Sequence, residues 1–463
     1  MLEAPLVRLL GYGVFWSRAA RHRFRANALE WIINLKRLII CSSLTTVPRS
    51  QGERLVERHI SILGIPVLVR RRQRAKYHVA LLVDEFFGGW DTAIGGYGAL
   101  ARKYICRFIP NDEIQIDLVL DAYGGLETRK RLVDETMIYR LSWHRMARQE
   151  WLDKQAYNLF LSIEMTEISF KILSEYETKA PLLYWIQDPR ELQMYQARLE
   201  TVTRLKDYDW AYIKDVADWM QQMIGERRVW FISQGESLSA IARKTYRIPE
   251  TVPIDDLPNP VEIEFDYTLN NPPKENKIIF LGRLEAQKRV WIACEIAKAM
   301  PQYEFYILGA IGKGRNEEAN ARTLAPYRNP DGRSKTPNLH FTGHVDGAAK
   351  NCHIKTAKLV LNTSIWEGIP VSWLEALSYG TLIVSAFDRD NIVRRFGTFV
   401  GEVMGDGTHE AALKRFTAAI EYWMTHDSER EAIAQRAIEF IRSRHSIPAF
   451  ADKMRAAILQ AIP

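Results

Sequence analysis

The sequence has few cysteines and no long apolar run, and each absence excludes a class of protein. Its four cysteines among 463 residues lie far apart and form no C-x-x-C pair, so neither a zinc site nor a disulfide framework is indicated. The best candidate for a membrane-spanning helix, residues 28–47, is interrupted by Glu30, Lys36 and Arg37, below the roughly 18 uncharged residues required. We therefore expect a soluble protein of two or three domains in a reducing cytoplasm.

Positive charge is concentrated before residue 77. Residues 1–76 hold 15 of the 63 Lys and Arg but only four of the 56 Asp and Glu, a net +11, whereas the rest of the chain carries −4. Trp16, Phe24 and Trp31 lie among these arginines, as in helices on a bilayer surface. Two interpretations stay open: docking on an anionic membrane, at the inner face of the plasma membrane, or a helical extension packed on the first domain with solvated charges. Nucleic-acid binding is not expected, because no recognised module accompanies the charge.

Apolar runs alternate with helical stretches from residue 77 onward, in two series. The first begins with Tyr77–Val83 (YHVALLV), a continuous run typical of a buried parallel strand, and the second with Lys277–Leu281, after the proline-rich stretch Pro253–Pro273. Two such series predict an α/β protein with two doubly wound, Rossmann-like domains that face each other across a cleft. The predicted parts are a basic helical N-terminal extension (1–76), a first domain (77–262), a second domain (263–447) and a C-terminal helix (448–463) packing back on the first domain.

The most informative residues follow an apolar strand of the second domain, where the sequence reads WEGIPVSWLEALSYG. Pro370 suits the first turn of a helix, which places Glu367 and Gly368 at the helix N-terminus and at the carboxyl edge of the sheet. The N–H groups of Gly368 and Ile369 would point at an anion there. Glu375 lies two turns further on. Carboxylates on both sides of an anion site fit a diphosphate that has hydroxyls on either side, as in a nucleotide sugar.

A second motif, GRLEAQK at residues 282–288, follows the first strand of the same domain. Gly282 ends the strand and lets a ligand approach the backbone. Arg283 and Lys288 then lie at the same edge of the sheet. Arg can donate two parallel hydrogen bonds to phosphate oxygens, and Lys acts as a point charge. Two cations against one diphosphate would stabilise a departing nucleoside diphosphate.

These motifs together resemble the family-four retaining glycosyltransferases of the GT-B fold. The resemblance covers most of residues 77–447 and rests on E-x7-E, on GRLxxxK, and on matches at Asn259–Pro260–Val261, at Gly343 within Phe341–Val345, and at Ser364. It implies that Glu367 contacts hydroxyls of the donor sugar and Glu375 the nucleotide ribose. It also implies that Arg283 and Lys288 hold the diphosphate and that transfer retains the anomeric configuration.

The activity that this resemblance implies is transfer of a hexose from a nucleotide-diphosphate sugar to a glycan or lipid-linked glycan acceptor. The pathway would be the synthesis of a cell-surface polysaccharide, such as lipopolysaccharide or capsule, and no metal or other cofactor would be required. Two other functions stay open. One is a sugar-nucleotide epimerase on the same fold, and the other is a non-catalytic partner in a polysaccharide assembly complex.

The first domain matches the family less well. Relatives carry a Gly-Gly loop after the first strand that approaches the donor phosphates, and two candidates are present, Gly88–Gly89 directly after the strand and Gly95–Gly96 at a spacing that better fits the next strand. Gln187 and Asp188 end a strand where relatives have a His or a Gln-Asp pair near the donor sugar. The pair resembles the rhamnosyltransferases of bacterial surface polysaccharides, and a turn cap before Pro189 is the alternative for Asp188.

One loop departs from the family pattern. Relatives often have Gly-Gly after the strand that corresponds to Thr381–Ala386, where this chain has Phe387-Asp-Arg-Asp-Asn391. Asp388 and Asp390 match the D-x-D pattern of metal-dependent transferases of another fold. We attribute that match to chance, because a cationic pair is already available for the diphosphate.

Overall fold

The computed structural model describes residues 40–48, 53–62, 65–92, 94–120, 127–176, 180–204, 211–312 and 317–463, in two compact units, Met1–Arg74 and Ala75–Pro463. The described residues of the first unit form a three-stranded antiparallel sheet of β1 (Ile40–Pro48), β2 (Glu53–Ile62) and β3 (Ile65–Arg74). The prediction of a helical extension is therefore wrong for these residues. Ile, Val and Thr, which recur in these three segments, favour an extended backbone. Membrane docking through residues 1–76 stays a prediction, and its aromatic residues Trp16, Phe24 and Trp31 lie outside the described residues.

The second unit contains two α/β lobes, of which the first is built on an eight-stranded sheet. All of its strands are parallel to their neighbours except β6, which pairs antiparallel with β7 at one edge. The strands, in spatial order, are β11 (Ile254–Asp256), β10 (Val229–Ser233), β9 (Leu182–Ile186), β8 (Leu159–Ile163), β4 (Tyr77–Leu82), β5 (Ile114–Leu120), β7 (Thr136–Arg140) and β6 (Arg129–Val133). The helices are α3 (Gly96–Ala99), continued as a π-helix to Ile105 and as α4 (Cys106–Phe108), then α5 (Arg145–Gln155), α6 (Glu167–Glu175), α7 (Leu192–Leu199), α8 (Ala211–Gly225) and α9 (Glu236–Tyr246).

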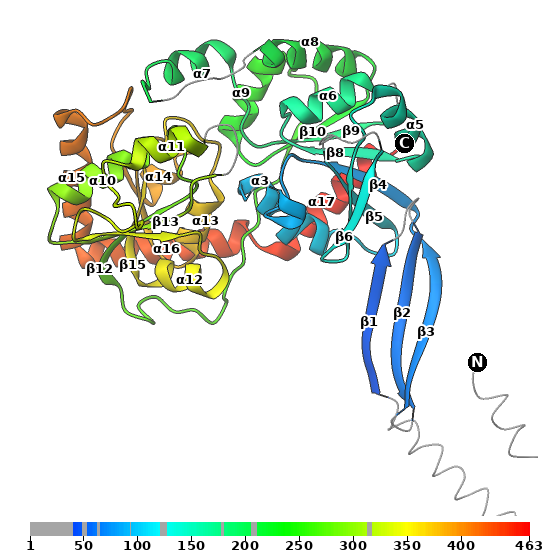
Figure 1. Ribbon diagram of the computed structural model, residues 1–463, viewed down its shortest axis with the longest axis horizontal. Helices are drawn as coiled ribbons and strands as arrows, with labels where there is room; N and C mark the ends of the chain where they lie inside the picture. The colour runs from blue at the N-terminus through cyan, green and yellow to red at the C-terminus, as the bar shows by residue number, and fades with distance from the viewer. Residues whose placement is uncertain are drawn as a thin grey trace, which may run out of the picture. The chain divides into compact units, whose positions relative to one another are not determined.

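The second lobe is built on a six-stranded, wholly parallel sheet (Figure 1). Its strands, in spatial order, are β14 (Leu339–Gly343), β13 (Glu304–Leu308), β12 (Glu275–Leu281), β15 (Ala357–Asn362), β16 (Leu382–Ser385) and β17 (Gly397–Phe399). The helices are α10 (Val290–Ala299), α11 (Glu317–Leu324), α12 (Gly347–Thr356), α13 (Val371–Ser378), α14 (Ile392–Arg395), α15 (Glu410–Thr425) and α16 (Asp427–Arg444). Two Rossmann-like sheets confirm the α/β fold predicted from the alternating pattern.

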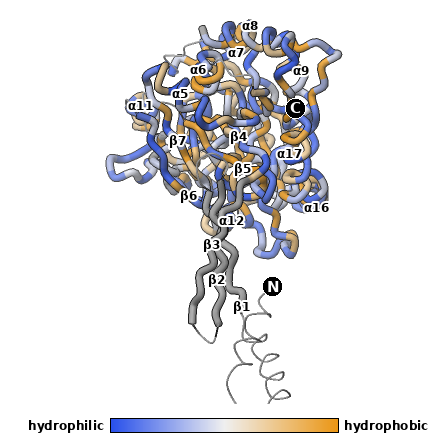
Figure 2. The backbone as a smooth tube through the Cα atoms, turned by 90° about the vertical axis from the view of Figure 1, so that its right-hand side faces the viewer, coloured by the Kyte–Doolittle hydropathy of each residue, from blue (hydrophilic) through white to orange (hydrophobic). Residues whose placement is uncertain are grey.

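The sheets fold in this way because their central strands are mostly apolar and are buried on both faces. Every residue of β5 is buried, as are all residues of β8, β9 and β15, and such strands need helices on both sides. Figure 2 shows hydrophobic residues gathered in the interior strands and hydrophilic residues in the outer helices and loops. Because the strands of each sheet run parallel, the loops after them meet at one edge, where ligands bind in such folds.

The last helix, α17 (Ile447–Ala461), leaves the second lobe and packs on the sheet of the first lobe (Figure 1). Phe450 and Met454 are buried there, and the ring of Phe450 lies 5.4 Å from that of Trp185 on β9. Arg455 donates a hydrogen bond to the carbonyl of Ile109 in the first lobe. The C-terminal helix therefore completes the core of the first lobe.

The chain crosses between the lobes in two places, and the two crossings are hydrogen-bonded to each other. The first crossing follows β11 and includes Asn259 and Val261, and the second joins α16 to α17 at His445. The N–H of Val261 donates to the carbonyl of His445 at 3.0 Å, and Nδ1 of His445 lies 2.7 Å from the carbonyl of Asn259. Burial lowers the pKa of His445 to about 4, so the ring is neutral near pH 7 and Nδ1 carries the proton that this contact requires.

Within the described ranges, no helix is long and apolar enough to cross a membrane.

Removing a large side chain from α17 should destabilise the protein. Phe450→Ala empties a buried position against Trp185, for which the expected loss is about 3 to 5 kcal/mol of unfolding free energy. Urea unfolding followed by circular dichroism measures it. Leu459→Ala on the same helix is the control, because that side chain is 40% exposed and should cost less than about 0.5 kcal/mol. Equal losses in both variants would show that α17 does not contribute to the core.

Candidate active site

A cavity of about 880 Å³ lies between the two lobes, at the carboxyl edges of both sheets. It is large enough to enclose a nucleotide sugar. Loops that follow β4, β9 and β10 line one side of it, and loops that follow β12, β13, β14 and β15 line the other. Eleven of the residues predicted from the sequence meet in its lining: Gly95, Gly96, Gln187, Asp188, Gly282, Arg283, Lys288, Glu367, Gly368, Ile369 and Glu375.

Glu367 lies in the loop between β15 and α13 and is held by two partners. It is 8% exposed, and its carboxylate pairs with the ammonium of Lys288. Ser364 Oγ donates a hydrogen bond to the same carboxylate oxygen at 2.6 Å. Ser364 is itself buried and does not line the cavity, so the structure places it behind Glu367, where it orients the carboxylate.

Arg283 follows β12 and faces carboxylates from both lobes. Its Nη1 lies 3.3 Å from Oε1 of Glu285 and 3.9 Å from Oε2 of Glu85 in the first lobe. Burial opposes its charge, but these carboxylates, Glu285 first, raise the pKa of Arg283. A permanent cation is thus available on the wall of the cavity, two residues after the strand end.

Glu375 belongs to a row of alternating charges that crosses from one lobe to the other. Its Oε1 accepts a hydrogen bond from Lys350 at 2.6 Å, and Lys350 lies 3.4 Å from Asp346. Asp346 in turn pairs with Lys103 of the first lobe at 2.7 Å. All four side chains line the cavity. Burial lowers the pKa of Lys350 but the neighbouring carboxylates, led by Glu375, raise it more, so the residue is charged.

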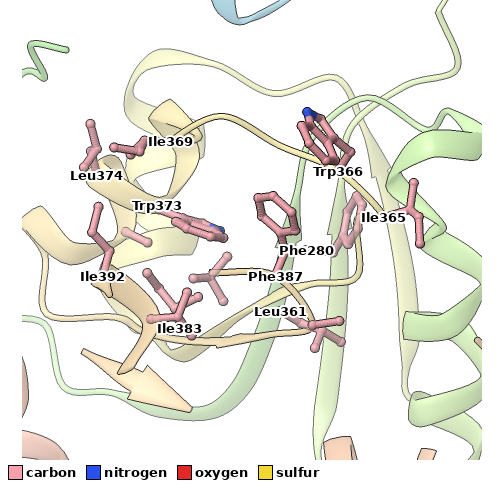
Figure 3. Packing of buried hydrophobic residues seen from close by; sticks show 14 of the residues in the cluster. Phe280, Leu361, Ile365, Trp366, Ile369, Trp373, Leu374, Ile383, Phe387 and Ile392 are labelled. Carbon is pink, nitrogen blue, oxygen red and sulfur yellow. The ribbon is translucent and has the colours of Figure 1, made fainter. Parts of the chain in front are cut away.

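Asp188 joins the two lobes at the back of the cavity. One carboxylate oxygen accepts a hydrogen bond from Trp366 Nε1 at 2.6 Å, and the other lies 3.4 Å from Nη2 of Arg190. The side chain is 8% exposed, and burial raises the pKa of Asp188 to about 6, although Arg190 opposes the shift. Figure 3 shows Trp366 at the edge of the buried cluster, beside Phe387 and Phe280. This position in the cavity suits the predicted role near the donor sugar, which stays a prediction.

A buried acid that the sequence interpretation missed holds the strand end on which Asp188 stands. Glu164 follows β8 and is 4% exposed. Its carboxylate accepts hydrogen bonds from the backbone N–H groups of Gln187 (2.9 Å) and Asp188 (2.5 Å) and from the hydroxyls of Tyr184 and Tyr246. The one sequence feature that could have pointed to Glu164 is that it is an acid directly after an apolar strand. Its partners come from other strands and helices, so the pattern along the chain could not reveal its role.

The structure separates the two candidate glycine pairs. Gly95 and Gly96 line the cavity, and a Cβ on Gly96 would have nothing within 4 Å, so the backbone there is open to a ligand. Gly88 and Gly89 do not line it: Gly88 adopts φ +77° in a turn that leads into the 3-10 turn Gly89–Asp91, packed on Phe86. Nor does Gly343 line the cavity, because its carbonyl pairs with the N–H of Gly309 at the sheet edge; the residues that follow, His344 to Asp346, do.

Gly368 is required by the contact between the lobes. A Cβ on this residue would lie 2.1 Å from the carbonyl oxygen of Gln187 and 3.0 Å from Nε2 of Gln234. Only glycine allows the loop after β15 to approach the first lobe this closely. The residue predicted to offer its N–H to an anion therefore also sets the distance between the two walls of the cavity.

The Asp388–Asn391 segment joins the lobes and supports Glu367. The carboxylate of Asp390 accepts hydrogen bonds from the N–H groups of Glu236 (3.0 Å) and Ser237 (2.8 Å) at the N-terminus of α9. Asp388 pairs with Arg394 of α14, the helix that follows this segment. Arg389 lies over the ring of Trp366, 4.8 Å from its centroid, and donates to the carbonyl of Glu367 at 3.1 Å. In the described part of the chain, no group of three or more His, Cys, Asp or Glu side chains is placed to hold a metal ion.

Comparison with known proteins agrees with this geometry. Residues 262–440 match the family model for glycosyl transferases group 1. The O-antigen biosynthesis glycosyltransferase WbnH of Escherichia coli is 24% identical over 148 residues, 32% of this chain and 38% of that protein, and the probable O-antigen biosynthesis glycosyltransferase WbiN of the same organism matches to the same extent. The match thus spans less than two fifths of the length of these curated relatives. The second lobe contains a glycosyltransferase group 1 domain.

Solved structures share the fold of both lobes. Sucrose-phosphate synthase of Thermosynechococcus elongatus has a TM-score of 0.59 at 12% identity, covering 83% of this chain and 98% of its own. The pneumococcal O-GlcNAc transferase GtfA in complex with UDP and GlcNAc, and Anabaena Alr3699/HepE in complex with UDP, each have a TM-score of 0.55 at 12% identity, with 83% of this chain covered and 99% and 100% of theirs. The fold is that of the GT-B glycosyltransferases.

A methyl group on Gly368 should force the lobes apart. Gly368→Ala puts a Cβ against the carbonyl of Gln187, and the nearby contact of Asp390 with the N-terminus of α9 should loosen with it. Hydrogen–deuterium exchange of the Glu236 and Ser237 amides should speed up on the order of tenfold. Gly225→Ala is the control, since nothing lies within 4 Å of the added atom. Unchanged exchange in Gly368→Ala would mean that the lobes do not meet at this residue in solution.

Proposed function

We propose that this chain is a retaining glycosyltransferase that moves a hexose from a nucleotide-diphosphate sugar to a glycan or lipid-linked glycan acceptor. The observation that carries the proposal is the meeting of Glu367, Glu375, Arg283 and Lys288 in one cavity, in a chain with a glycosyltransferase group 1 domain. Two carboxylates for hydroxyls and two cations for a diphosphate are the groups that such a donor needs.

In the proposed complex, the donor replaces the ion pairs that the cavity charges now make with one another. The diphosphate lies against Arg283 and Lys288, which releases Glu367 from Lys288 to bind hydroxyls of the sugar. Glu375 receives the ribose hydroxyls while the hydrogen bond from Lys350 holds its carboxylate in place. Ser364 orients Glu367 throughout, because its hydroxyl does not face the ligand.

The reaction breaks the bond between the anomeric carbon and the diphosphate oxygen, and forms a bond from the same face to an acceptor hydroxyl. The acceptor proton passes to the departing diphosphate. Positive charge that develops on the sugar ring is stabilised by the carboxylate of Asp188, and negative charge on the leaving group by Arg283 and Lys288. This assignment needs no metal ion, since the two cations serve the diphosphate.

Two observations narrow the substrate within this proposal. The curated relatives are named for O-antigen biosynthesis, which supports a role in the synthesis of a cell-surface polysaccharide. Gln187 and Asp188 resemble the corresponding pair of rhamnosyltransferases, and both line the cavity, which supports a deoxyhexose such as rhamnose as the transferred sugar.

A panel of UDP-, GDP- and dTDP-sugars with a mixed glycan acceptor, followed by mass spectrometry, tests the activity. One donor should be consumed, with an acceptor product heavier by one hexosyl or deoxyhexosyl unit. Glu367→Gln should lower kcat on the order of 100-fold or more, because the charged partner of the reacting sugar is lost. Glu304→Gln is the matched control, an exposed carboxylate at the opposite end of β13 from the cavity.

Other results would exclude the proposal. A new nucleotide sugar formed without any acceptor would indicate an epimerase. Absence of both binding and turnover for all donors, or full turnover in Glu367→Gln, would contradict the transferase.

The pH dependence of the reaction should report Asp188. Its pKa is raised to about 6, so the carboxylate is ionised above this pH and becomes neutral below it. If the charged form acts on the sugar, kcat/KM of the wild type should fall about tenfold per pH unit below pH 6, and Asp188→Asn should lack this acidic limb. If the acidic limb persisted in Asp188→Asn, it would belong to a group other than Asp188.

A further inference from the structure

A buried acid from the first lobe occupies the part of the cavity predicted to hold the diphosphate. Glu85 follows β4, lines the cavity and is only 7% exposed. It belongs to none of the motifs identified in the sequence. A carboxylate is an unexpected neighbour for a phosphate, because like charges in a poorly solvated site repel each other.

The position of Glu85 is fixed by the segment that contains Gly95 and Gly98. Its Oε1 accepts a hydrogen bond from the N–H of Gly98 at 3.0 Å. A Cβ on Gly95 would lie 2.2 Å from one carboxylate oxygen and 2.4 Å from the other. Gly95 is therefore a glycine because Glu85 fills the space beside it, whereas Gly96, with nothing within 4 Å of an added Cβ, leaves room for a ligand.

Glu85 also faces the cation assigned to the diphosphate. Arg283 Nη1 lies 3.9 Å from Oε2 of Glu85, across the gap between the lobes. Burial raises the pKa of Glu85, while Arg283 and the N–H groups of Gly98 and Tyr97 oppose the rise. Glu285, which is also near Arg283, favours the neutral form. The charge of Glu85 thus depends on Arg283 being free to face it.

We propose that Glu85 takes up a proton when the nucleotide-diphosphate donor binds, and that its neutral carboxyl group then donates a hydrogen bond to the diphosphate. The inference rests on the proposed function, since it assumes a diphosphate at Arg283. A bound diphosphate neutralises Arg283, which removes the main group that holds Glu85 ionised, and adds negative charge beside the carboxylate. Both changes favour the protonated form. The proton comes from solvent, and no covalent bond to the donor is made or broken.

Proton uptake on binding determines the direction in which the affinity for the donor changes with pH. Binding that takes up a proton weakens as pH rises, by up to tenfold in Kd per pH unit between the pKa of Glu85 in the free protein and in the complex. The protein should therefore bind its donor more tightly on the acidic side of neutrality, for as long as the other groups at the cavity keep their charge.

Isothermal titration calorimetry of the full chain with UDP, GDP and dTDP tests the proposal. Measurements at pH 8.0 in Tris and in HEPES separate proton exchange from the heat of binding, and at this pH the terminal phosphate of each nucleotide is already ionised. The wild type should take up as much as one proton more per nucleotide than Glu85→Gln. Glu85→Gln keeps an oxygen for the N–H of Gly98. It should bind more tightly than the wild type at pH 8.0 and lose the part of the pH dependence of Kd that arises from Glu85.

Glu304→Gln is the control. This acid is exposed and lies at the opposite end of β13 from the cavity, so proton uptake should match the wild type. Equal proton uptake in the wild type and Glu85→Gln would overturn the inference while leaving the transferase intact. If none of the three nucleotides bound, the proposed function and this inference would both fail. Thermal melting of each variant checks that the fold is retained. Should Glu85→Gln not fold, Glu85→Ala provides a second test, because it also removes the carboxyl group and should lose the proton uptake.

Discussion

The ion pair of Glu367 with Lys288 is the interaction on which the rest of the site depends. An ionised carboxylate that is 8% exposed needs a cation and further donors, and Lys288 and Ser364 supply them from the loops after β12 and β15. The same requirement repeats around the cavity, where Glu375 faces Lys350, Asp346 faces Lys103 and Asp188 faces Arg190. Each of these charged side chains on the cavity wall is held by an opposite charge.

Much of this arrangement could be predicted from the sequence, because the patterns that indicate it lie within short segments of the chain. Continuous apolar runs such as YHVALLV identified buried parallel strands, and parallel strands bring their following loops to one edge. The positions of Glu367, Arg283 and Lys288 in one cavity follow from that rule alone. Local patterns also misled: the arginines and aromatic residues before residue 77 suggested a helix, whereas residues 40–48, 53–62 and 65–74 are strands.

The remaining features depend on contacts between segments far apart in the chain. Glu85 and Glu164 carry no motif, and their importance comes from partners in other strands and loops. The Asp388–Asp390 pattern resembled a metal motif, yet the carboxylate of Asp390 caps α9 of the other lobe and that of Asp388 pairs with Arg394 of the following helix α14. Gly95 was predicted to approach phosphate, but the space beside it belongs to Glu85. Spacing along a chain cannot distinguish a glycine that admits a ligand from one that admits a neighbouring side chain.

The two crossings between the lobes constrain how the cavity can open. A single flexible crossing would let one lobe swivel in any direction about the other. Here the crossing at Val261 and the crossing at His445 are tied side by side by hydrogen bonds at 3.0 and 2.7 Å. Two adjacent attachment points permit rotation of the lobes about the line that joins them and resist twisting about other axes. Opening of the cavity would then be widest at the wall farthest from this line, while residues beside the line keep their mutual distances.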